Sequence, residues 1–313
     1  MANLKILIAD GLDERGRSIL RTSAEVDDRN GISAEDLVNI VGDYDGLIVR
    51  GRTRVTASVF EAASRLKVVG RAGVGVDNID LEAAKKHGVA VVNAPTSTTI
   101  AVAELAFGLL LALAREIPRG DASMKQGNWI KKELEGVELN GKTLGVVGYG
   151  RIGTEVGRRA AAFGMNVVVY DPNVSEDELT HGDAEPVSLQ DLFAWSDFIS
   201  LHLPLNVQTR DLIGRAEFSQ MKDGVRIVST ARGGIIDEAA LLDALNEEKV
   251  AGAALDVFSK EPPGLTDLIS HPCVIATPHV GAQTSEAQSR AAEDIAEEVL
   301  AALHGKPLRW RVA

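Results

Sequence analysis

Short runs rich in valine, isoleucine and leucine alternate with amphipathic stretches along most of the chain. Such runs are typical of parallel strands that are buried on both faces and connected by helices. The predicted strands form two series, 4–9, 47–49, 66–69 and 89–92, and then 143–147, 165–170, 198–201, 226–229, 251–255 and 274–276. This pattern predicts an α/β protein with two parallel sheets, the second of them doubly wound.

Two long helices are also predicted, at 98–114 and 285–303. The first is strongly apolar, but it contains Glu104 and is shorter than the roughly 20 residues that cross a bilayer, so we expect a buried helix. It separates the two series of strands, which places a domain boundary near Pro95. The pattern alone leaves open which domain receives the C-terminal helix.

The composition limits the partners and the compartment. The 313 residues include 33 basic and 45 acidic side chains, and the net charge of −12 disfavours a nucleic-acid partner. Cys273 is the single cysteine, so an internal disulfide is excluded, and the N-terminus lacks the pattern of a signal peptide. These features favour a reducing cytoplasm. No cluster of ligand-type residues in the sequence indicates a metal site.

A glycine-rich motif, GYGRIG, spans Gly148 to Gly153 between an apolar strand and an amphipathic helix. Gly148 allows a tight turn, Gly150 lets the backbone approach a pyrophosphate, and Gly153 lets the helix pack on the sheet. The next strand ends at Asp171, close to the spacing of about 20 residues at which a carboxylate binds the ribose hydroxyls of adenosine. An acidic residue there would repel the additional phosphate of NADP, so the motif predicts NAD as the cofactor.

Further candidate residues follow the later strands. Arg232 stands beside two glycines after the strand at 226–229, where its guanidinium can bind a carboxylate. Glu261 and His279 follow the next two strands and could together transfer a proton. Taken alone, His279 would as readily be a structural histidine. The histidines with weaker context are His87, His181, His202, His271 and His304.

Four arginines follow two strands of the first series: Arg50, Arg52, Arg54 and Arg71. In a chain of net charge −12 they would form a local positive site that suits a phosphate group. The alternative is that some of them are solvated surface charges, and we favour this interpretation for Arg52.

Six segments, in this order, resemble the NAD-dependent D-2-hydroxyacid dehydrogenase family: GRAGVGVDNID, AELAFGLLLALAREIP, ELNGKTLGVVGYGRIG, STARGGIIDE, AGAALDVFSKEPP and TPHVGAQTSEAQ. The resemblance implies a Rossmann-type doubly wound parallel sheet and a smaller flavodoxin-like α/β domain built from both ends of the chain. The implied domains are a substrate-binding domain at 1–95 and 284–313 and an NAD-binding domain at 96–283. A homodimer formed through the NAD-binding domain is implied as well, with 100–114 as a candidate core.

The resemblance also assigns roles to the residues of the site. By it, Arg232 holds the carboxylate and the carbonyl oxygen of the substrate, His279 is the acid and base, and Glu261 orients His279. Beyond the three glycines, the implied cofactor contacts are Arg151, Ile152, Asp171, Thr230, Ala231, Asp256, His279 and Gly281. The implied substrate contacts are Arg50, Arg71, Gly73 and Arg232, with Lys131 and Lys132 reaching the cleft of a neighbouring subunit.

Two positions depart from the family pattern. Val74 replaces a threonine that many members carry, which removes a hydroxyl contact to the cofactor. Tyr149 replaces a smaller residue between the first two glycines, and we expect its side chain to point away from the cofactor loop.

Within the family the chain is most similar to short-form members that act on a phosphorylated hydroxy acid. This implies NAD-dependent oxidation of 3-phospho-D-glycerate to 3-phosphohydroxypyruvate, a step of serine biosynthesis, in which His279 accepts the hydroxyl proton while hydride leaves the same carbon. One alternative is another enzyme of the family, a glyoxylate/hydroxypyruvate reductase or a D-lactate-type dehydrogenase, which needs no phosphate site. A second alternative is an NAD-sensing corepressor that binds peptide motifs of partner proteins.

Overall fold

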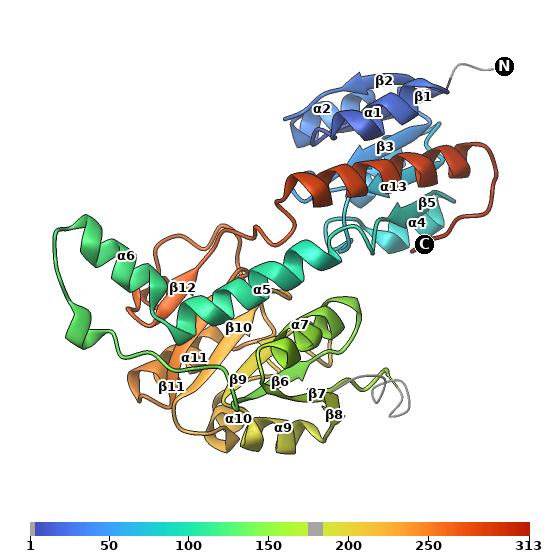
Figure 1. Ribbon diagram of the computed structural model, residues 1–313. Helices are drawn as coiled ribbons and strands as arrows, with labels where there is room; N and C mark the ends of the chain where they lie inside the picture. Colours follow the sequence, from blue (N-terminus) through green and yellow to red (C-terminus); the bar gives the residue numbers. More distant parts are fainter. Residues whose placement is uncertain (1–3, 175–183) are drawn as a thin grey trace. The chain divides into compact units, whose positions relative to one another are not determined.

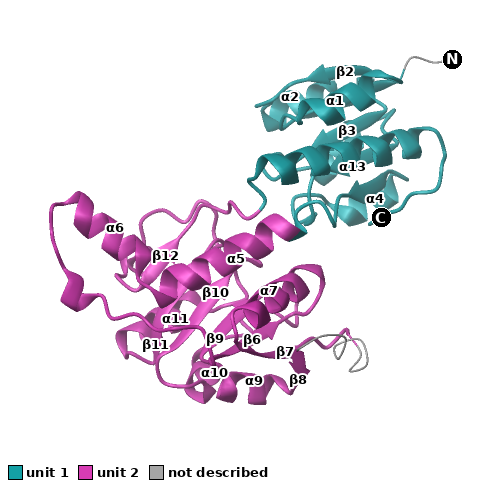
Figure 2. Cartoon of the chain, viewed as in Figure 1, with its two compact units in different colours: residues 1–99, 282–313 teal, residues 100–281 magenta. Residues whose placement is uncertain are grey.

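The computed structural model describes residues 4–174 and 184–313, which form two compact units (Figures 1 and 2). Unit 1 consists of residues 1–99 and 282–313, and unit 2 consists of residues 100–281. Relative to the boundaries expected from the sequence, residues 96–99 and 282–283 lie in unit 1. His181, one of the histidines with weaker context, lies outside the described residues.

Unit 1 contains five parallel strands in the order β2-β1-β3-β4-β5. They are β1 (Lys5–Ile8), β2 (Glu25–Asp28), β3 (Gly46–Val49), β4 (Val68–Arg71) and β5 (Ala90–Asn93). This is the strand order of flavodoxin-like sheets, so the expected fold of the smaller domain is confirmed. β2 is absent from the sequence prediction because its residues, EVDD, are polar and it lies at an edge of the sheet, where none of them is fully buried.

The C-terminal helix α13 (Ser285–Leu303) belongs to unit 1, which answers the question that the hydrophobic pattern left open. It packs on α1 (Glu14–Arg21) and on β4 and β5. The approach to α1 is close: a Cβ on Gly16 would lie 2.5 Å from the carbonyl oxygen of Ala292. The remaining helices of the unit are α2 (Ala34–Ile40), α3 (Ala57–Ala62), α4 (Leu81–Lys86) and the short 3-10 helix η1 (Val41–Asp43).

Unit 2 contains seven parallel strands in the order β12-β11-β10-β9-β6-β7-β8. They are β6 (Thr143–Val147), β7 (Asn166–Tyr170), β8 (Ala184–Pro186), β9 (Phe198–Leu201), β10 (Val225–Ser229), β11 (Val250–Leu255) and β12 (Val274–Ala276). The chain starts in the middle at β6, runs outward to β8, and then returns to β9 on the other side of β6. This is the doubly wound Rossmann-type arrangement that was expected.

Helix α5 (Thr99–Ala114) is largely buried in unit 2. Its Ala103, Phe107 and Leu110 pack in one core with Val146 of β6 and Val156 of α7 (Arg151–Ala162). The other helices of the unit are α6 (Ile117–Lys125), η2 (Lys131–Glu133), α9 (Leu189–Trp195), α10 (Arg215–Gln220), α11 (Glu238–Asn246) and α12 (Asp267–Ser270). Across residues 4–174 and 184–313, α5 included, no helix combines the length and the apolar character that crossing a membrane requires.

Candidate active site

The predicted cofactor residues of unit 2 lie at one edge of its sheet. All seven strands are parallel, so their carboxyl ends share an edge, and ligands of such sheets bind where the strand order reverses. Here the reversal falls between β6 and β9. The residues in question follow β6, β7, β10, β11 and β12, which places them along this edge on both sides of the reversal.

The glycine loop after β6 has the geometry that a pyrophosphate needs. Gly148 has φ of 92°, and a Cβ there would lie 2.8 Å from the carbonyl carbon of His202. A Cβ on Gly153 would overlap the carbonyl oxygen of Gly148, whereas a Cβ on Gly150 would meet no atom within 4 Å. The space over Gly150 therefore adjoins the N-terminus of α7, where the N–H groups of the first turn, including those of Arg151 and Ile152, have no partner inside the helix.

Asp171 is held beside this loop. One of its carboxylate oxygens accepts a hydrogen bond from the backbone N–H of Tyr149 at 2.9 Å, and the other accepts from the N–H of Asn173 at 2.9 Å. The Tyr149 ring packs against α7, with its hydroxyl 3.0 Å from the position of a Cβ on Gly157. The tyrosine side chain is thus directed into the core and leaves the loop clear.

The turn after β10 brings Arg232 against the segment that follows β11. Arg232 donates from Nη1 to the carbonyl oxygen of Ala231 at 2.7 Å. Only a glycine fits at Gly233, because a Cβ would overlap the backbone of Phe258. In the same turn Thr230 is 8% exposed, and its hydroxyl has no hydrogen-bond partner among the described residues. A buried hydroxyl without a partner is the type of group that a bound ligand satisfies.

His279 and Glu261 form the central pair of the site. Nδ1 of His279 lies 2.8 Å from Oε2 of Glu261, and Oε1 of Glu261 accepts from the backbone N–H of Phe258 at 3.1 Å. Burial raises the pKa of Glu261, but the hydrogen bonds from His279 and Phe258, together with the charges of His279 and Arg232, lower it below the usual value. The carboxylate is therefore ionised at neutral pH, and Arg232 is close enough to contribute to that.

Asp256, at the end of β11, fixes the loop that carries His279. Its side chain is buried, with the residue only 1% exposed. One oxygen accepts from the hydroxyl of Thr277 at 2.6 Å and from the N–H of Val280 at 2.8 Å, and the other accepts from the N–H of Gly281 at 2.9 Å. The residues on both sides of His279, which itself has φ of 53°, are thereby tied to the sheet. Thr277 was not identified from the sequence, although it stands directly after a predicted strand.

The structure brings the predicted substrate arginines of unit 1 together at its own sheet edge. β3 and β4 are neighbours, with Val49 opposite Arg71, so Arg50 and Arg71 emerge side by side. The Arg71 guanidinium lies against Gly73, where φ is 146° and a Cβ would overlap it, and it is 3.9 Å from the position of a Cβ on Gly51. Gly73 therefore makes room for Arg71 beside the loop that begins at Arg50.

Arg50 has no acidic partner in the described part of the chain. Its guanidinium donates to Oε1 of Gln283 at 3.3 Å, and the ion pairs of residues 4–174 and 184–313 do not include it. Burial lowers the pKa of Arg50, and the charge of Asp10 partly opposes this. A partly buried guanidinium that is bound only to a neutral amide is suited to an anionic ligand.

Two basic residues differ from the rest of this set. Arg52 is exposed, as expected for a surface charge, but it also forms an ion pair with Asp10 at 3.2 Å and donates to the carbonyl oxygen of Ala9 at 3.0 Å. Lys131 is exposed in η2, and the contacts of the described residues do not bring it to either sheet edge.

His202 also lies at the cofactor edge, although its sequence context seemed weak. It follows β9, its Nε2 is 2.8 Å from the hydroxyl of Ser200, and its buried Nδ1 has no hydrogen-bond partner among the described residues. Burial lowers the pKa of His202 to about 3, so the ring is neutral at physiological pH. Its position at the end of a predicted strand was the signal that could have identified it.

Strand order, glycine loop and strand-end residues together define unit 2 as a dinucleotide-binding α/β unit. Residues 107–281 match the family model described as D-isomer specific 2-hydroxyacid dehydrogenase, NAD binding domain. The chain belongs to the D-isomer specific 2-hydroxyacid dehydrogenase family, and unit 2 is its NAD-binding domain.

Individual relatives extend the match to nearly the whole chain. A D-3-phosphoglycerate dehydrogenase of Rattus norvegicus is 50% identical over 98% of this chain, and one of Methanocaldococcus jannaschii is 49% identical over 97% of it. The chain spans 58% of the length of each of these curated relatives. Among solved structures, a glyoxylate reductase from Paecilomyes thermophila is similar with a TM-score of 0.91 and 33% identity, over 100% of this chain and 99% of that one.

Proposed function

We propose that this chain oxidises 3-phospho-D-glycerate to 3-phosphohydroxypyruvate with NAD as the hydride acceptor. The observation that carries the proposal is the His279–Glu261 pair beside Arg232 at the carboxyl edge of the NAD-binding sheet. A histidine held by a carboxylate and placed near an arginine is the set of groups that oxidation of a 2-hydroxy acid needs. The names of the rat and archaeal relatives support the choice of substrate.

In this proposal each residue has a defined task. Because Nδ1 of His279 is bound to Glu261, Nε2 is the nitrogen that accepts the hydroxyl proton. The Glu261 carboxylate holds the ring in place and stabilises the imidazolium that forms. Arg232 binds the substrate carboxylate and, in the reverse direction, polarises the carbonyl oxygen. Asp256 positions this histidine by accepting hydrogen bonds from the hydroxyl of Thr277 before it and from the backbone N–H groups of Val280 and Gly281 after it.

The residues present fit NAD. Two observations support this: the open space over Gly150 at the start of α7, and the buried Thr230 hydroxyl without a partner among the described residues. In the proposal the glycine loop with Arg151 and Ile152 holds the pyrophosphate, and Asp171 holds the adenosine ribose. Thr230, Ala231, Asp256 and Gly281 would surround the nicotinamide half. When bound, NAD supplies the hydride acceptor, and the residues of the chain supply orientation and proton transfer.

The arginine cluster of unit 1 supports a phosphorylated substrate over the alternatives. A glyoxylate reductase has the same fold, as the Paecilomyes thermophila structure shows, so the fold does not separate the two activities. Arg50, without an acidic partner among the described residues, and Arg71 beside it are better explained by a phosphate group than by the small anion glyoxylate. A corepressor function would give neither arginine such a task.

The proposal is tested by following NADH formation with 3-phospho-D-glycerate, D-glycerate and D-lactate, and NADH consumption with glyoxylate and hydroxypyruvate. We expect the highest kcat/KM for 3-phospho-D-glycerate in the oxidative direction. An equal or higher value for an unphosphorylated acid would favour the glyoxylate reductase or D-lactate alternative. Absence of turnover with all five, despite NAD binding, would favour the corepressor alternative.

Asp171 gives a prediction about cofactor choice. We expect the wild-type protein to use NAD far better than NADP, because the carboxylate would face the additional phosphate. Asp171→Ala should lower kcat/KM for NAD by roughly 10- to 150-fold, which corresponds to the loss of charged hydrogen bonds worth about 1.5–3 kcal/mol, and should narrow the gap to NADP. Asn173→Ala is the matched control, since only its backbone contacts Asp171. Comparable use of both cofactors by the wild-type protein would contradict the assignment.

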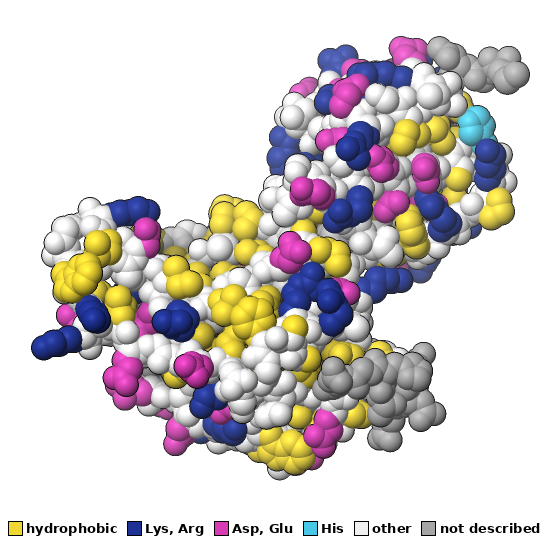
Figure 3. Space-filling model, in the orientation of Figure 1, with side chains coloured by type: hydrophobic (Ala, Val, Ile, Leu, Met, Phe, Trp, Pro, Cys, Tyr) yellow, Lys and Arg dark blue, Asp and Glu magenta, His cyan; other side chains and the backbone are white. Residues whose placement is uncertain are grey.

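We also propose that the chain forms a homodimer through unit 2, but through a different segment than α5. Most apolar side chains of α5 are buried in the core of the unit. By contrast, three apolar side chains on and just after α6 are exposed: Ile117 by 54%, Met124 by 58% and Trp129 by 77%. Hydrophobic side chains are visible over α5 and α6 on the face drawn in Figure 3. Exposed apolar side chains of this kind suit a symmetric contact with a second copy.

Trp129→Glu should therefore weaken the dimer by roughly 10²- to 10⁴-fold, because the symmetric contact loses two large side chains worth about 1.5–3 kcal/mol each. The measurement is sedimentation equilibrium across a range of protein concentrations. Trp195→Glu is the control, since Trp195 is a 44% exposed tryptophan on α9. A monomeric wild-type protein, or an unweakened Trp129→Glu dimer, would exclude this surface.

A further inference from the structure

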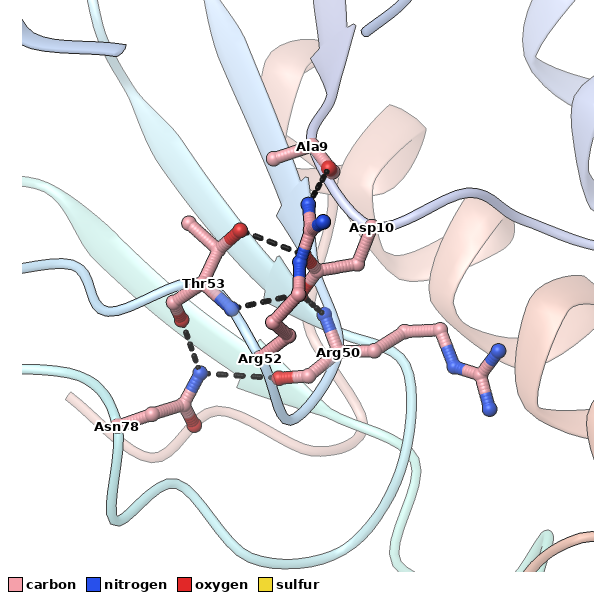
Figure 4. Close-up of polar contacts among 6 residues, drawn as sticks. All are labelled: Ala9, Asp10, Arg50, Arg52, Thr53 and Asn78. Atoms are coloured by element: carbon pink, nitrogen blue, oxygen red, sulfur yellow. Dashed lines mark hydrogen bonds and ion pairs between the residues drawn. The ribbon is translucent and has the colours of Figure 1, made fainter. Parts of the chain in front are cut away.

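One buried carboxylate organises the loop from which Arg50 emerges. Asp10 follows β1, and its side chain is 4% exposed. One of its oxygens accepts from the N–H of Arg50 at 2.7 Å and from the N–H of Thr53 at 3.1 Å. The other accepts from the Thr53 hydroxyl at 2.5 Å and from Nε of Arg52 at 3.2 Å (Figure 4). Every residue of this loop except the glycine at its centre thus donates to a single side chain.

Asn78 closes the same loop from the other side. Its side-chain amide donates to the carbonyl oxygen of Arg50 at 2.9 Å and to that of Thr53 at 2.7 Å. The N–H and the C=O of both Arg50 and Thr53 are therefore bound by two side chains, which fixes the backbone at each end of the loop. Figure 4 shows the Arg50 side chain extending away from this network, with its guanidinium clear of Asp10, Thr53 and Asn78.

The network also determines which arginine is available to a ligand. Burial raises the pKa of Asp10, but its hydrogen bonds from Thr53 and Arg50 and the charge of Arg52 lower it overall, so the carboxylate is ionised at neutral pH. This negative charge is paired with the guanidinium of Arg52, whereas Arg50 contributes only its backbone N–H. The guanidinium of Arg50 feels the charge of Asp10 but forms no ion pair with it among the described residues, and it donates its hydrogen bond to Gln283.

From this arrangement we propose that Asp10 is a positioning residue of the phosphate site, and that by fixing the 50–53 loop it sets the preference for a phosphorylated over an unphosphorylated substrate. The inference rests on the proposed function, in which Arg50 binds the phosphate. Asp10 itself touches no substrate in this account. Its effect is exerted through the backbone of Arg50, so it should act on the phosphorylated substrate specifically.

A carboxylate elsewhere in unit 1 provides a matched control. Asp45 has a side chain that is 6% exposed, accepts from the N–H of Lys5 at 3.1 Å, and pairs with Arg65 at 2.9 Å and Lys67 at 3.3 Å. Burial raises the pKa of Asp45 as well, and its hydrogen bonds and cationic neighbours lower it overall. It differs from Asp10 in place: it directly precedes β3, at the opposite end of that strand from Arg50. Loss of the Asp45 side chain should lower the stability of unit 1 without affecting the 50–53 loop.

The experiment compares Asp10→Ala, Asp10→Asn, Asp45→Ala and Arg50→Ala for kcat/KM with 3-phospho-D-glycerate and with D-glycerate, for the KM of NAD, and for Tm. Asp10→Ala should lower kcat/KM for 3-phospho-D-glycerate by roughly 10- to 100-fold, mainly through KM, and that for D-glycerate by less than about 3-fold. Asp10→Asn keeps an oxygen that can accept from the N–H groups of Arg50 and Thr53, so its kcat/KM for 3-phospho-D-glycerate should fall less than that of Asp10→Ala. Asp45→Ala should lower Tm and leave the ratio of the two substrates unchanged.

The outcomes separate this inference from the proposed function. If Arg50→Ala discriminates between the substrates and Asp10→Ala lowers both equally, as Asp45→Ala does, Asp10 is merely structural and the inference is wrong. If Arg50→Ala does not discriminate, the phosphate site itself is misplaced and the inference falls with it. Should Asp10→Ala fail to fold, Thr53→Val removes the 2.5 Å hydrogen bond while keeping the shape of the side chain, and it must then shift the substrate ratio in the same direction.

Discussion

Replacing His279 by alanine is expected to lower kcat by roughly 10²- to 10⁴-fold while NAD affinity is nearly retained. The imidazole is the group held by Glu261 at 2.8 Å, so its removal deletes the proton acceptor together with its orientation. The glycine loop and Asp171, which we assign to the adenosine half of NAD, belong to other strand ends and are not altered. The measurement is the single-turnover rate of NADH formation, accompanied by direct titration of NAD binding.

His271→Ala is the matched control for this prediction. His271 lies in the same unit, in the segment between α12 and β12, where its Nδ1 accepts from the N–H of Cys273 at 3.2 Å. Its loss should leave the chemical rate nearly unchanged. If His279→Ala retained the wild-type single-turnover rate, His279 would have no part in the chemistry, and the base would have to be sought among other residues.

Arg50→Ala and Arg71→Ala are each expected to lower kcat/KM for 3-phospho-D-glycerate by roughly 10- to 150-fold, because a hydrogen bond to a charged group is worth about 1.5–3 kcal/mol. D-glycerate has no phosphate and should be much less affected. A contact that only binds the phosphate raises KM, whereas one that also aligns the reacting carbon lowers kcat as well. Steady-state kinetics of both variants with both substrates measure these effects.

Arg54→Ala serves as the control for the arginine variants, since Arg54 is an exposed arginine four residues from Arg50 in the same segment. Arg54→Ala should change kcat/KM for neither substrate by more than about 2-fold, as expected for a surface charge. If Arg50→Ala and Arg71→Ala lowered kcat/KM equally for the two substrates, these arginines would support the fold or the cofactor. Lys131 and Lys132 of a neighbouring subunit would then be the next candidates for the phosphate contact.

Much of the fold follows from the hydrophobic pattern, and the strands it misses have a physical reason. Strands buried on both faces need continuous apolar residues, so β6 and β9 stand out in the sequence. β2 and β8 lie at sheet edges, and the short polar runs EVDD and AEP carry no such signal. The hydrophobic pattern also could not place α13, because amphipathicity shows that a helix packs on something without showing on what; its place in the smaller domain was implied by the family resemblance alone.

Some residues of the candidate site could likewise be predicted from the sequence, and others could not. Residues such as His279 and Arg232 could be found because parallel strands bring their carboxyl ends to one edge, which makes position in the chain informative. The positioning roles of Asp10 and Asp256 could not be predicted from the sequence. The groups that Asp10 binds are at least 40 residues away in the chain, and those that Asp256 binds are at least 21 residues away, so they become neighbours only in the folded protein. The same holds for the ion pair of Arg52 with Asp10, which the sequence pattern did not indicate.

Hydride transfer from substrate to NAD can be followed directly with a labelled substrate. 3-Phospho-D-glycerate carrying deuterium at C2 is incubated with the protein and NAD, and the reduced cofactor is analysed by mass spectrometry with unlabelled substrate in parallel. We expect deuterated NADH in amounts equal to the 3-phosphohydroxypyruvate formed, and about 10²- to 10⁴-fold less of both products with His279→Ala over the same time. If no deuterium reached NADH from this substrate while D-glycerate or D-lactate labelled in the same way delivered it, the proposed activity would be contradicted.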